Sequence, residues 1–202
     1  MLGAAQGRLV LTQRSQSGFS IIELSIAITI IAILVMLGMP SFAEYMANAR
    51  LGATAQSFFS GLNVARSEAI RRNGTVEFAM TNTPLGPGIE NNLLADVTGR
   101  NWVVRARASA STPYDSPPID AKTALEGGGA TPRVTVNSTT SIITFDGLGS
   151  ATSGVATISI DNPPAGLCAP AGPVRCWNVV VSAGGQVHLC DRAALQGDSR
   201  AC

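Results

Sequence analysis

The feature that most constrains this chain of 202 residues is the apolar run from Phe19 to Met39. Sixteen of its 21 residues are apolar. As a helix, such a run would be roughly 32 Å long, close to the ~30 Å hydrocarbon core of a bilayer. We therefore expect residues 19–39 to form a membrane-spanning helix.

The leader before this run carries Arg8 and Arg14 and no acidic residue. A cleaved secretory signal peptide is disfavoured for two reasons. The run exceeds the usual ~7–15-residue apolar core, and Met39-Pro40-Ser41 is a poor cleavage site. A single-span anchor fits better, and its positive N-terminal side would place the leader in the cytoplasm and the rest of the chain outside.

One charged residue, Glu23, interrupts the apolar run. A carboxylate inside a membrane is energetically expensive, which marks it by default as a functional residue with a partner. Cleavage after Gly18 would create a new amine on Phe19, one helical turn before Glu23. Glu23 would then neutralise that amine in its own chain or in a neighbouring subunit.

The leader, Gly18, Phe19, Glu23, the apolar stretch and Pro40 together resemble the N-terminal signature of type IV pilin-like proteins. The resemblance implies that a prepilin peptidase cuts after Gly18 and that the new N-terminal Phe19 is methylated. The retained helix would hold the protein in the inner membrane by a single pass, with its C-terminal domain in the periplasm. In a pilus, the same helix would form the filament core and the protein would be extracellular. The leader is long for this family.

The helical pattern continues past Pro40, which we expect to kink the helix, and it ends at Asn73-Gly74. Its apolar residues change face along the way. The earlier stripe would meet neighbouring subunits or the membrane surface, and the later one would cover the protein's own sheet. A single amphipathic helix is the alternative. The earlier stripe is Phe42, Tyr45, Met46, Ala49 and Ala53, and the later stripe is Leu51, Ala55, Phe58, Leu62, Ala65 and Ala69.

Two further stretches of sequence indicate one group within this family. Residues 65–73, with three arginines, and residues 143–149 resemble the FimT/GspH group of minor pilins and pseudopilins. The resemblance implies an α+β type IV pilin fold, in which the second half of the long N-terminal helix packs on an antiparallel β-sheet domain. We expect the arginines near the helix end to favour the helix dipole rather than to bind nucleic acid.

Residues 74–202 hold 25 glycines and prolines, and short extended runs alternate there with turn clusters. Long loops are expected at residues 81–99 and 109–132, and a hairpin turn at Ala183-Gly184-Gly185. The predicted strands are Thr75–Met80, Trp102–Ala108, Arg133–Val136, Ser141–Phe145, Val155–Ile160, Trp177–Val181 and Gln186–Cys190. The whole chain would divide into a leader, a membrane and filament-core helix, an amphipathic helix and a β-rich domain at residues 1–18, 19–39, 40–73 and 74–202.

All four cysteines, Cys168, Cys176, Cys190 and Cys202, lie in the last 35 residues. The expected orientation places them outside the cytoplasm, where disulfides persist. Three pairings are possible. We favour a bridge that closes a proline-rich loop, Cys168–Cys176, and one that ties down the C-terminal tail, Cys190–Cys202. A zinc site would require short paired spacings that this sequence lacks.

Little in the sequence points to catalysis. The single histidine, His188, alternates with Val187 and Leu189 on a predicted strand, and Lys122 is the only lysine. The sequence has no phosphate-binding glycine loop with a lysine, and no nucleophile motif supports a Ser/His/Asp site. We therefore expect a structural or binding protein, not an enzyme, without a cofactor or a metal.

The resemblance favours a minor pilin of a type IV pilus, incorporated at or near the tip. It would support pilus assembly, motility and DNA uptake. Its partners would be the prepilin peptidase, other pilin subunits and the pilus assembly machinery. The alternative is a GspH-like pseudopilin of type II secretion.

Double-stranded DNA is a further candidate partner. Some FimT-like minor pilins bind DNA through a C-terminal Gly-Arg-x-Arg motif, in whose place this chain has Gly197-Asp198-Ser199-Arg200. Only Arg200 carries over, although Arg192 is nearby. The formal charge of +1 excludes a globally basic nucleic-acid binder, so any DNA affinity must come from where the arginines lie.

Overall fold

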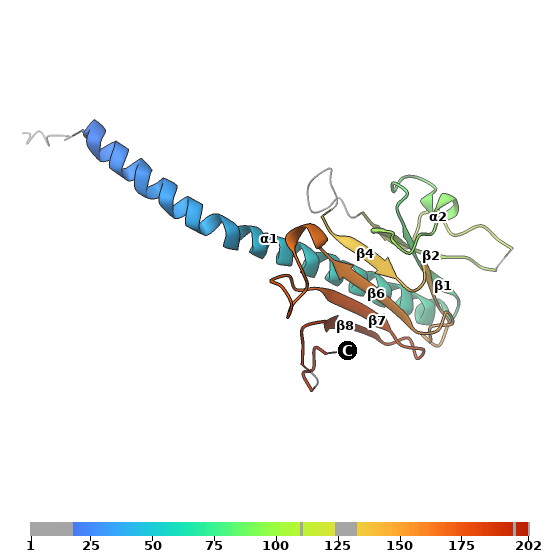
Figure 1. Cartoon of the computed structure of the whole chain (residues 1–202). Coiled ribbons are helices and arrows are strands. Elements are labelled where there is room, and N and C mark those ends of the chain that lie inside the picture. The colour runs from blue at the N-terminus through green and yellow to red at the C-terminus, as the bar shows by residue number, and fades with distance from the viewer. Residues whose placement is uncertain (1–17, 110, 124–132, 196, 202) are drawn as a thin grey trace, which may run out of the picture. The chain divides into compact units, whose positions relative to one another are not determined.

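The computed structural model describes residues 18–109, 111–123, 133–195 and 197–201. The chain forms two compact units, Met1–Pro40 and Ser41–Cys202. The described part of the first unit is the start of the helix α1, which spans Ile21–Arg72 and continues through Pro40 (Figure 1). Within α1, Ile21–Met39 is long and apolar enough to cross a membrane, with a mean hydropathy of 2.6.

The end of α1 is the one that the sequence predicts. Asn73 adopts a left-handed conformation with φ of 47°, and the Gly74 amide donates to the Ala69 carbonyl at 3.1 Å. This arrangement satisfies a carbonyl of the last turn that has no partner within the helix.

The later apolar stripe of α1 forms the helical side of the core in the second unit. The earlier stripe is largely exposed, so its contact with neighbouring subunits or the membrane surface stays a prediction, and the alternative of a single amphipathic helix stays open. Phe42 and Tyr45 are 65% and 68% exposed, and Ala49 and Ala53 are exposed as well. The six residues of the later stripe are at most 1% exposed: Leu51, Ala55, Phe58, Leu62, Ala65 and Ala69.

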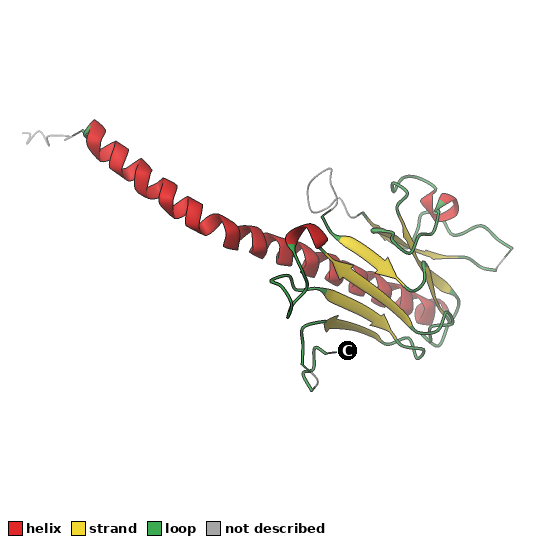
Figure 2. Cartoon of the chain, viewed as in Figure 1, coloured by secondary structure: helices red, strands yellow, loops and turns green. Residues whose placement is uncertain are grey.

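Two four-stranded antiparallel sheets complete the second unit (Figures 1 and 2). The first sheet has the order β3-β2-β1-β5, and the second has the order β4-β6-β7-β8. The strands of the first sheet are β1 (Val76–Thr81), β2 (Asn101–Ala106), β3 (Asp120–Lys122) and β5 (Ile142–Phe145). Those of the second are β4 (Thr135–Ser138), β6 (Ala156–Asp161), β7 (Trp177–Val181) and β8 (Val187–Asp191).

The α+β architecture is confirmed, and the sequence did not predict that the strands divide between two sheets. The chain changes sheets three times, between β3 and β4, between β4 and β5, and between β5 and β6. The last change uses the turn after Phe145, where Asp146 Oδ1 accepts hydrogen bonds from the amides of Leu148 and Ser150, each at 2.9 Å. Strand alternation shows which residues face inward, but not which strands pair, so the sequence left this division undetermined.

Two short elements lie inside segments that the sequence assigns to loops. The helix α2 (Ile89–Asn92) lies in the first predicted loop and β3 in the second. A 3-10 turn, η1 (Pro163–Ala165), follows β6. All three residues of β3 are exposed, so β3 carries no apolar alternation that would identify it.

One core joins α1 to both sheets. It contains the later stripe of α1, Phe78 of β1, Phe145 of β5, Ile158 of β6 and Val179 of β7. The aromatic rings of Phe58 and Phe78 meet edge to face, with centroids 6.0 Å apart. This shared core fixes the surfaces that the two sheets and the helix present outward.

Candidate functional site

The N-terminal end of α1 presents the predicted processing and assembly residues. Gly18 and Phe19 lie just before the helix, and Phe19 is 86% exposed. Glu23 lies in the first turn of α1 and is exposed. A negative charge in this turn is favoured by the amide groups that have no partner at a helix N-terminus.

Nothing in the described part of the fold requires a glycine at position 18. A Cβ on Gly18 would meet no atom within 4 Å, and Gly18 is not among the glycines with a positive φ. Neither steric space nor backbone conformation therefore explains this residue.

The basic residues at the end of α1 are bound to carboxylates. Arg71 and Arg72 both donate to Glu68, at 2.6 Å and 3.1 Å, and Arg72 also donates to Asp115 at 2.8 Å. The Arg71 guanidinium, together with that of Arg72, lowers the pKa of Glu68 to about 2. The two arginines and two acids cancel in charge, which agrees with a structural role for this cluster.

A buried polar network lies on the outer face of the first sheet. Arg105 of β2 is 6% exposed, and its Nη2 donates to Glu77 Oε2 of β1 at 2.9 Å. Arg105 Nη1 also donates to the Glu90 carbonyl of α2 at 2.8 Å. The Tyr114 ring covers the guanidinium at 3.8 Å, and the Tyr114 hydroxyl donates to Glu77 Oε2 at 2.8 Å.

This network fixes the two long loops onto the first sheet. Tyr114 and Asn91 of α2 exchange hydrogen bonds between the backbone of Tyr114 and the amide side chain of Asn91. Burial, together with the bond to Glu77, raises the pKa of Tyr114, so its hydroxyl stays protonated and donates. The loops predicted at residues 81–99 and 109–132 are thus held by polar contacts where they are described.

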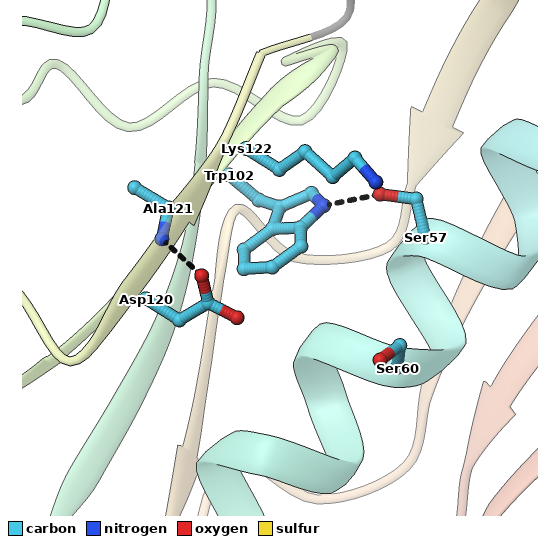
Figure 3. Close-up of a pocket in the computed structure, with 6 residues that line it drawn as sticks. All are labelled: Ser57, Ser60, Trp102, Asp120, Ala121 and Lys122. Carbon is cyan, nitrogen blue, oxygen red and sulfur yellow. Dashed lines mark hydrogen bonds between the residues drawn. The ribbon is translucent and has the colours of Figure 1, made fainter. Parts of the chain in front are cut away.

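A polar groove of about 290 Å³ lies between α1 and β3 (Figure 3). Ser57 and Ser60 of α1 face Asp120, Ala121 and Lys122 of β3 across it, and Trp102 lies between them. The Trp102 Nε1 donates to Ser57 Oγ at 3.0 Å. Hydroxyl, carboxylate and ammonium groups line the groove, which suits contact with a polar surface.

The C-terminal region contains one of the two predicted disulfides. Cys168 and Cys176 are bonded, which confirms that pairing. Cys190 is buried in β8, but Cys202 lies outside the described residues, so their pairing stays a prediction. The loop closed by the disulfide is fixed to α1, where Asn48 accepts from the Arg175 amide at 2.8 Å and donates to the Pro173 carbonyl at 3.3 Å.

The two arginines predicted to bind DNA each lie against a carboxylate. Arg192 donates to Asp161 at 2.6 Å, and Arg200 donates to Asp198 at 2.7 Å. Hydrogen bonds from Arg200 lower the pKa of Asp198 to about 2. Because each positive charge is matched by a negative one, the tail offers little net attraction to phosphate, and DNA binding stays a prediction.

His188 lies on β8 opposite Val180 and is exposed. Among the described residues, its imidazole makes no hydrogen bond. The residues that sequence reasoning missed are Glu77, Tyr114 and Asp161, which acquire their partners only through contacts distant in sequence. No local motif marks them.

Comparison with known families identifies the two parts of the chain. Residues 13–39 match the family model described as the prokaryotic N-terminal methylation motif. Residues 54–185 match the family model of type II transport protein GspH, which covers more than half of the chain.

Solved structures of two proteins are similar to this chain at low sequence identity. The minor type IV pilin FimU of Pseudomonas aeruginosa is 17% identical, with a TM-score of 0.50 over 72% of this chain and 91% of FimU. The minor pseudopilin EpsH of the Vibrio cholerae type 2 secretion system is 16% identical, with a TM-score of 0.46 over 72% of this chain and 99% of EpsH. With its methylation motif, its long N-terminal helix and its matched globular domain, the chain belongs to the GspH family of minor pilins and pseudopilins.

Proposed function

We propose that the protein is a minor pilin of a type IV pilus, anchored in the inner membrane before assembly. A prepilin peptidase would cleave after Gly18, and α1 would carry the subunit into the filament, at or near its tip. The globular unit would lie in the periplasm before assembly and outside the cell afterwards. Its role would be structural, in pilus assembly and motility.

The observation that carries this proposal is the exposed apolar segment of α1. Ile21–Met39 has no buried residue, yet it precedes a unit with a complete core of its own. An apolar surface of this length needs a membrane or a bundle of similar helices to cover it. A filament subunit uses both environments in turn, which supports retention of the helix after processing.

Glu23 supports assembly into a filament over simple anchoring. A lipid-exposed carboxylate is costly, and the described residues around it include no cation. A new amine on Phe19 of the same or a neighbouring subunit would supply the missing positive charge. A protein that is only anchored in the membrane would not need a charged residue at the position of Glu23.

A pseudopilin of type II secretion is the second candidate. The description of the matched family, type II transport protein GspH, favours it. The name of the FimU structure, a type IV minor pilin, favours the pilus instead. Both candidates share processing, anchoring and filament assembly, so they differ in the machine that the subunit serves.

A gene deletion scored in parallel for twitching motility and for secretion of folded proteins tests the proposal. Loss of twitching with intact secretion is the expected result, whereas the reverse would identify a pseudopilin.

Complementation with Glu23→Ala should fail to restore incorporation into sheared filaments. The matched control is Glu44→Ala, which removes an acid of the same helix outside the apolar run and should restore incorporation. Full incorporation of the Glu23→Ala subunit would contradict the assembly role.

A further inference from the structure

An exposed loop without any charged or hydrophilic side chain follows β6. This segment, residues 163–174, is called the apolar loop below; it includes η1 and consists only of proline, alanine, glycine, leucine, cysteine and valine. Seven of its twelve residues are exposed, and Leu167 is 69% exposed. Because loops that face water are usually polar, this composition points to contact with an apolar surface.

The backbone of the apolar loop makes most of its hydrogen bonds internally. A segment that leaves bulk water must do so, because each unpaired backbone group is costly there. Four of the twelve residues are prolines, which have no amide hydrogen. Five of the other eight amides donate within the loop or to the Asn162 carbonyl: those of Ala165, Gly166, Ala169, Gly172 and Val174. The Cys168–Cys176 disulfide also constrains the loop, so it can leave water without refolding.

The apolar loop is attached to α1 near the apolar span (Figure 1). Asn48 of α1 donates to the Pro173 carbonyl at 3.3 Å and accepts from the Arg175 amide at 2.8 Å. Asn48 is nine residues after Met39, the last residue of that span. Because α1 is helical between these two residues, they are about 14 Å apart along its axis. The loop is therefore held close to the point at which α1 would leave a membrane.

We propose that the apolar loop contacts the interfacial layer of the bilayer while the protein is anchored. This inference rests on the membrane anchoring in the proposed function. The headgroup layer is roughly 5–8 Å deep on each side of a bilayer, and membrane helices tilt by ~20° on average. Phe42 and Tyr45, which follow the span and are 65% and 68% exposed, would lie in or beside this layer. A tilt toward the loop would bring Leu167 to the same depth.

The composition of the apolar loop favours lipid over a protein partner. Protein interfaces are centred on aromatic or arginine anchors and carry hydrogen bonds between side chains. The loop has none of these residues, and Leu167 is its only large side chain that is exposed. Contact with fluid lipid needs only an apolar surface with few unpaired polar groups, which the loop provides.

Spin labels at three engineered cysteines test the contact in the full chain, reconstituted in phosphatidylcholine vesicles. Ala171→Cys places the label in the apolar loop, and Val35→Cys places it in the apolar span. Leu148→Cys is the matched control, because Leu148 is 84% exposed and its neighbour Gly149 packs on Ile70, about 33 Å beyond Asn48 along α1. Relaxation by a water-soluble nickel chelate reports the exposure of each label.

We expect the label at position 35 to be inaccessible to nickel, and the label at position 171 to be at least about fivefold less accessible than that at position 148. Equal accessibility at positions 171 and 148, with position 35 protected, would overturn the loop contact and leave the anchoring intact. A water-exposed label at position 35 would overturn the anchoring and this proposal together.

A charge at Leu167 separates lipid contact from simple burial. Leu167→Asp should raise the nickel accessibility at position 171 at least about threefold, because a carboxylate is not tolerated against lipid. Leu148→Asp, the matched control, should leave it unchanged. Both side chains are exposed, and circular dichroism establishes that each variant is folded. An unchanged label in the Leu167→Asp chain would overturn the proposal.

Dilution of the chain in the vesicles distinguishes lipid from a neighbouring subunit. Protection at position 171 should persist when the lipid-to-protein ratio is raised, because lipid remains in excess. Protection that disappears on dilution would identify a second subunit as the partner and overturn the lipid contact.

Discussion

Gly61 of α1 lies in direct contact with Trp102 of β2. A Cβ on Gly61 would fall 2.9 Å from two carbons of the indole and 2.8 Å from a ring carbon of Phe78. The indole is held in place by its hydrogen bond to Ser57, one turn earlier on the helix. The close approach of α1 to the first sheet therefore depends on the absence of a side chain at position 61.

Gly61→Ala should destabilise the protein by about 1–3 kcal/mol, because a methyl group would overpack a well-packed core. The matched control is Gly52→Ala, where a Cβ would meet no atom within 4 Å. That substitution should stabilise α1 by up to about 1 kcal/mol. Denaturant unfolding of the full chain in micelles, followed by tryptophan fluorescence, measures both. A neutral Gly61→Ala would contradict the packing described.

The two stripes of α1 should respond differently to truncation. Phe58→Ala should cost about 3–5 kcal/mol of stability, because Phe58 is 1% exposed. Phe42→Ala should change stability by less than about 0.5 kcal/mol, because Phe42 is mostly exposed. It should instead reduce the yield of subunit in sheared filaments. If Phe42→Ala unfolded the protein, the assignment of this stripe to neighbouring subunits would be wrong.

The helix could be predicted closely from the sequence and the sheets only in part. The six residues of the later stripe, from Leu51 to Ala69, recur every three or four positions and so define one face of the helix. They were predicted to face the core, and all six are buried. Strands of four to six residues carry less pattern, and their partners are chosen by contacts distant in sequence. That is why β3 was missed and why the division of the strands into two sheets was not predicted.

Arg105 should be the residue on which the outer loops most depend. Arg105→Ala would remove the closest charge partner of the partly buried Glu77, which keeps Arg107 at 3.4 Å, and should cost about 2–3 kcal/mol. Tyr114→Phe keeps the ring over the guanidinium and removes only the hydroxyl, so it should cost about 1–2 kcal/mol. Limited proteolysis between residues 82 and 119 measures loop release. The prediction fails if Arg105→Ala is no more sensitive to protease than Tyr114→Phe.

Glu68 should make stability depend on acid. Its pKa is lowered from 4.5 to about 2 by Arg71 and Arg72, so its contribution is complete above pH 4.5 and declines as the pH falls to about 2. The contribution should not exceed about 1 kcal/mol, because the cluster is at the surface. Glu68→Gln should flatten the stability curve across this window. Asp198→Asn is the variant for comparison, because the pKa of Asp198 is also lowered to about 2 and its effect on stability would fall in the same pH range. A Glu68→Gln curve parallel to that of the unsubstituted protein would exclude the effect.

As with the fold, a candidate site could be predicted from the sequence only where its residues are close together in the chain. Gly18, Phe19 and Glu23 are neighbours in sequence, so their pattern is visible without a structure. Asp161 and Arg192 become partners only because β6 and the end of β8 are brought together across β7. The sequence offered Arg192 only as a possible contact to DNA phosphate, and the structure places it against the Asp161 carboxylate.

The most direct test of the account is the N-terminus of the mature protein. The account holds that the chain is cut after Gly18 and keeps its apolar helix. Mass spectrometry of the protein purified from membranes and from sheared filaments should find N-terminal methylated Phe19 in both. An intact leader, or an N-terminus beyond Met39, would contradict the account.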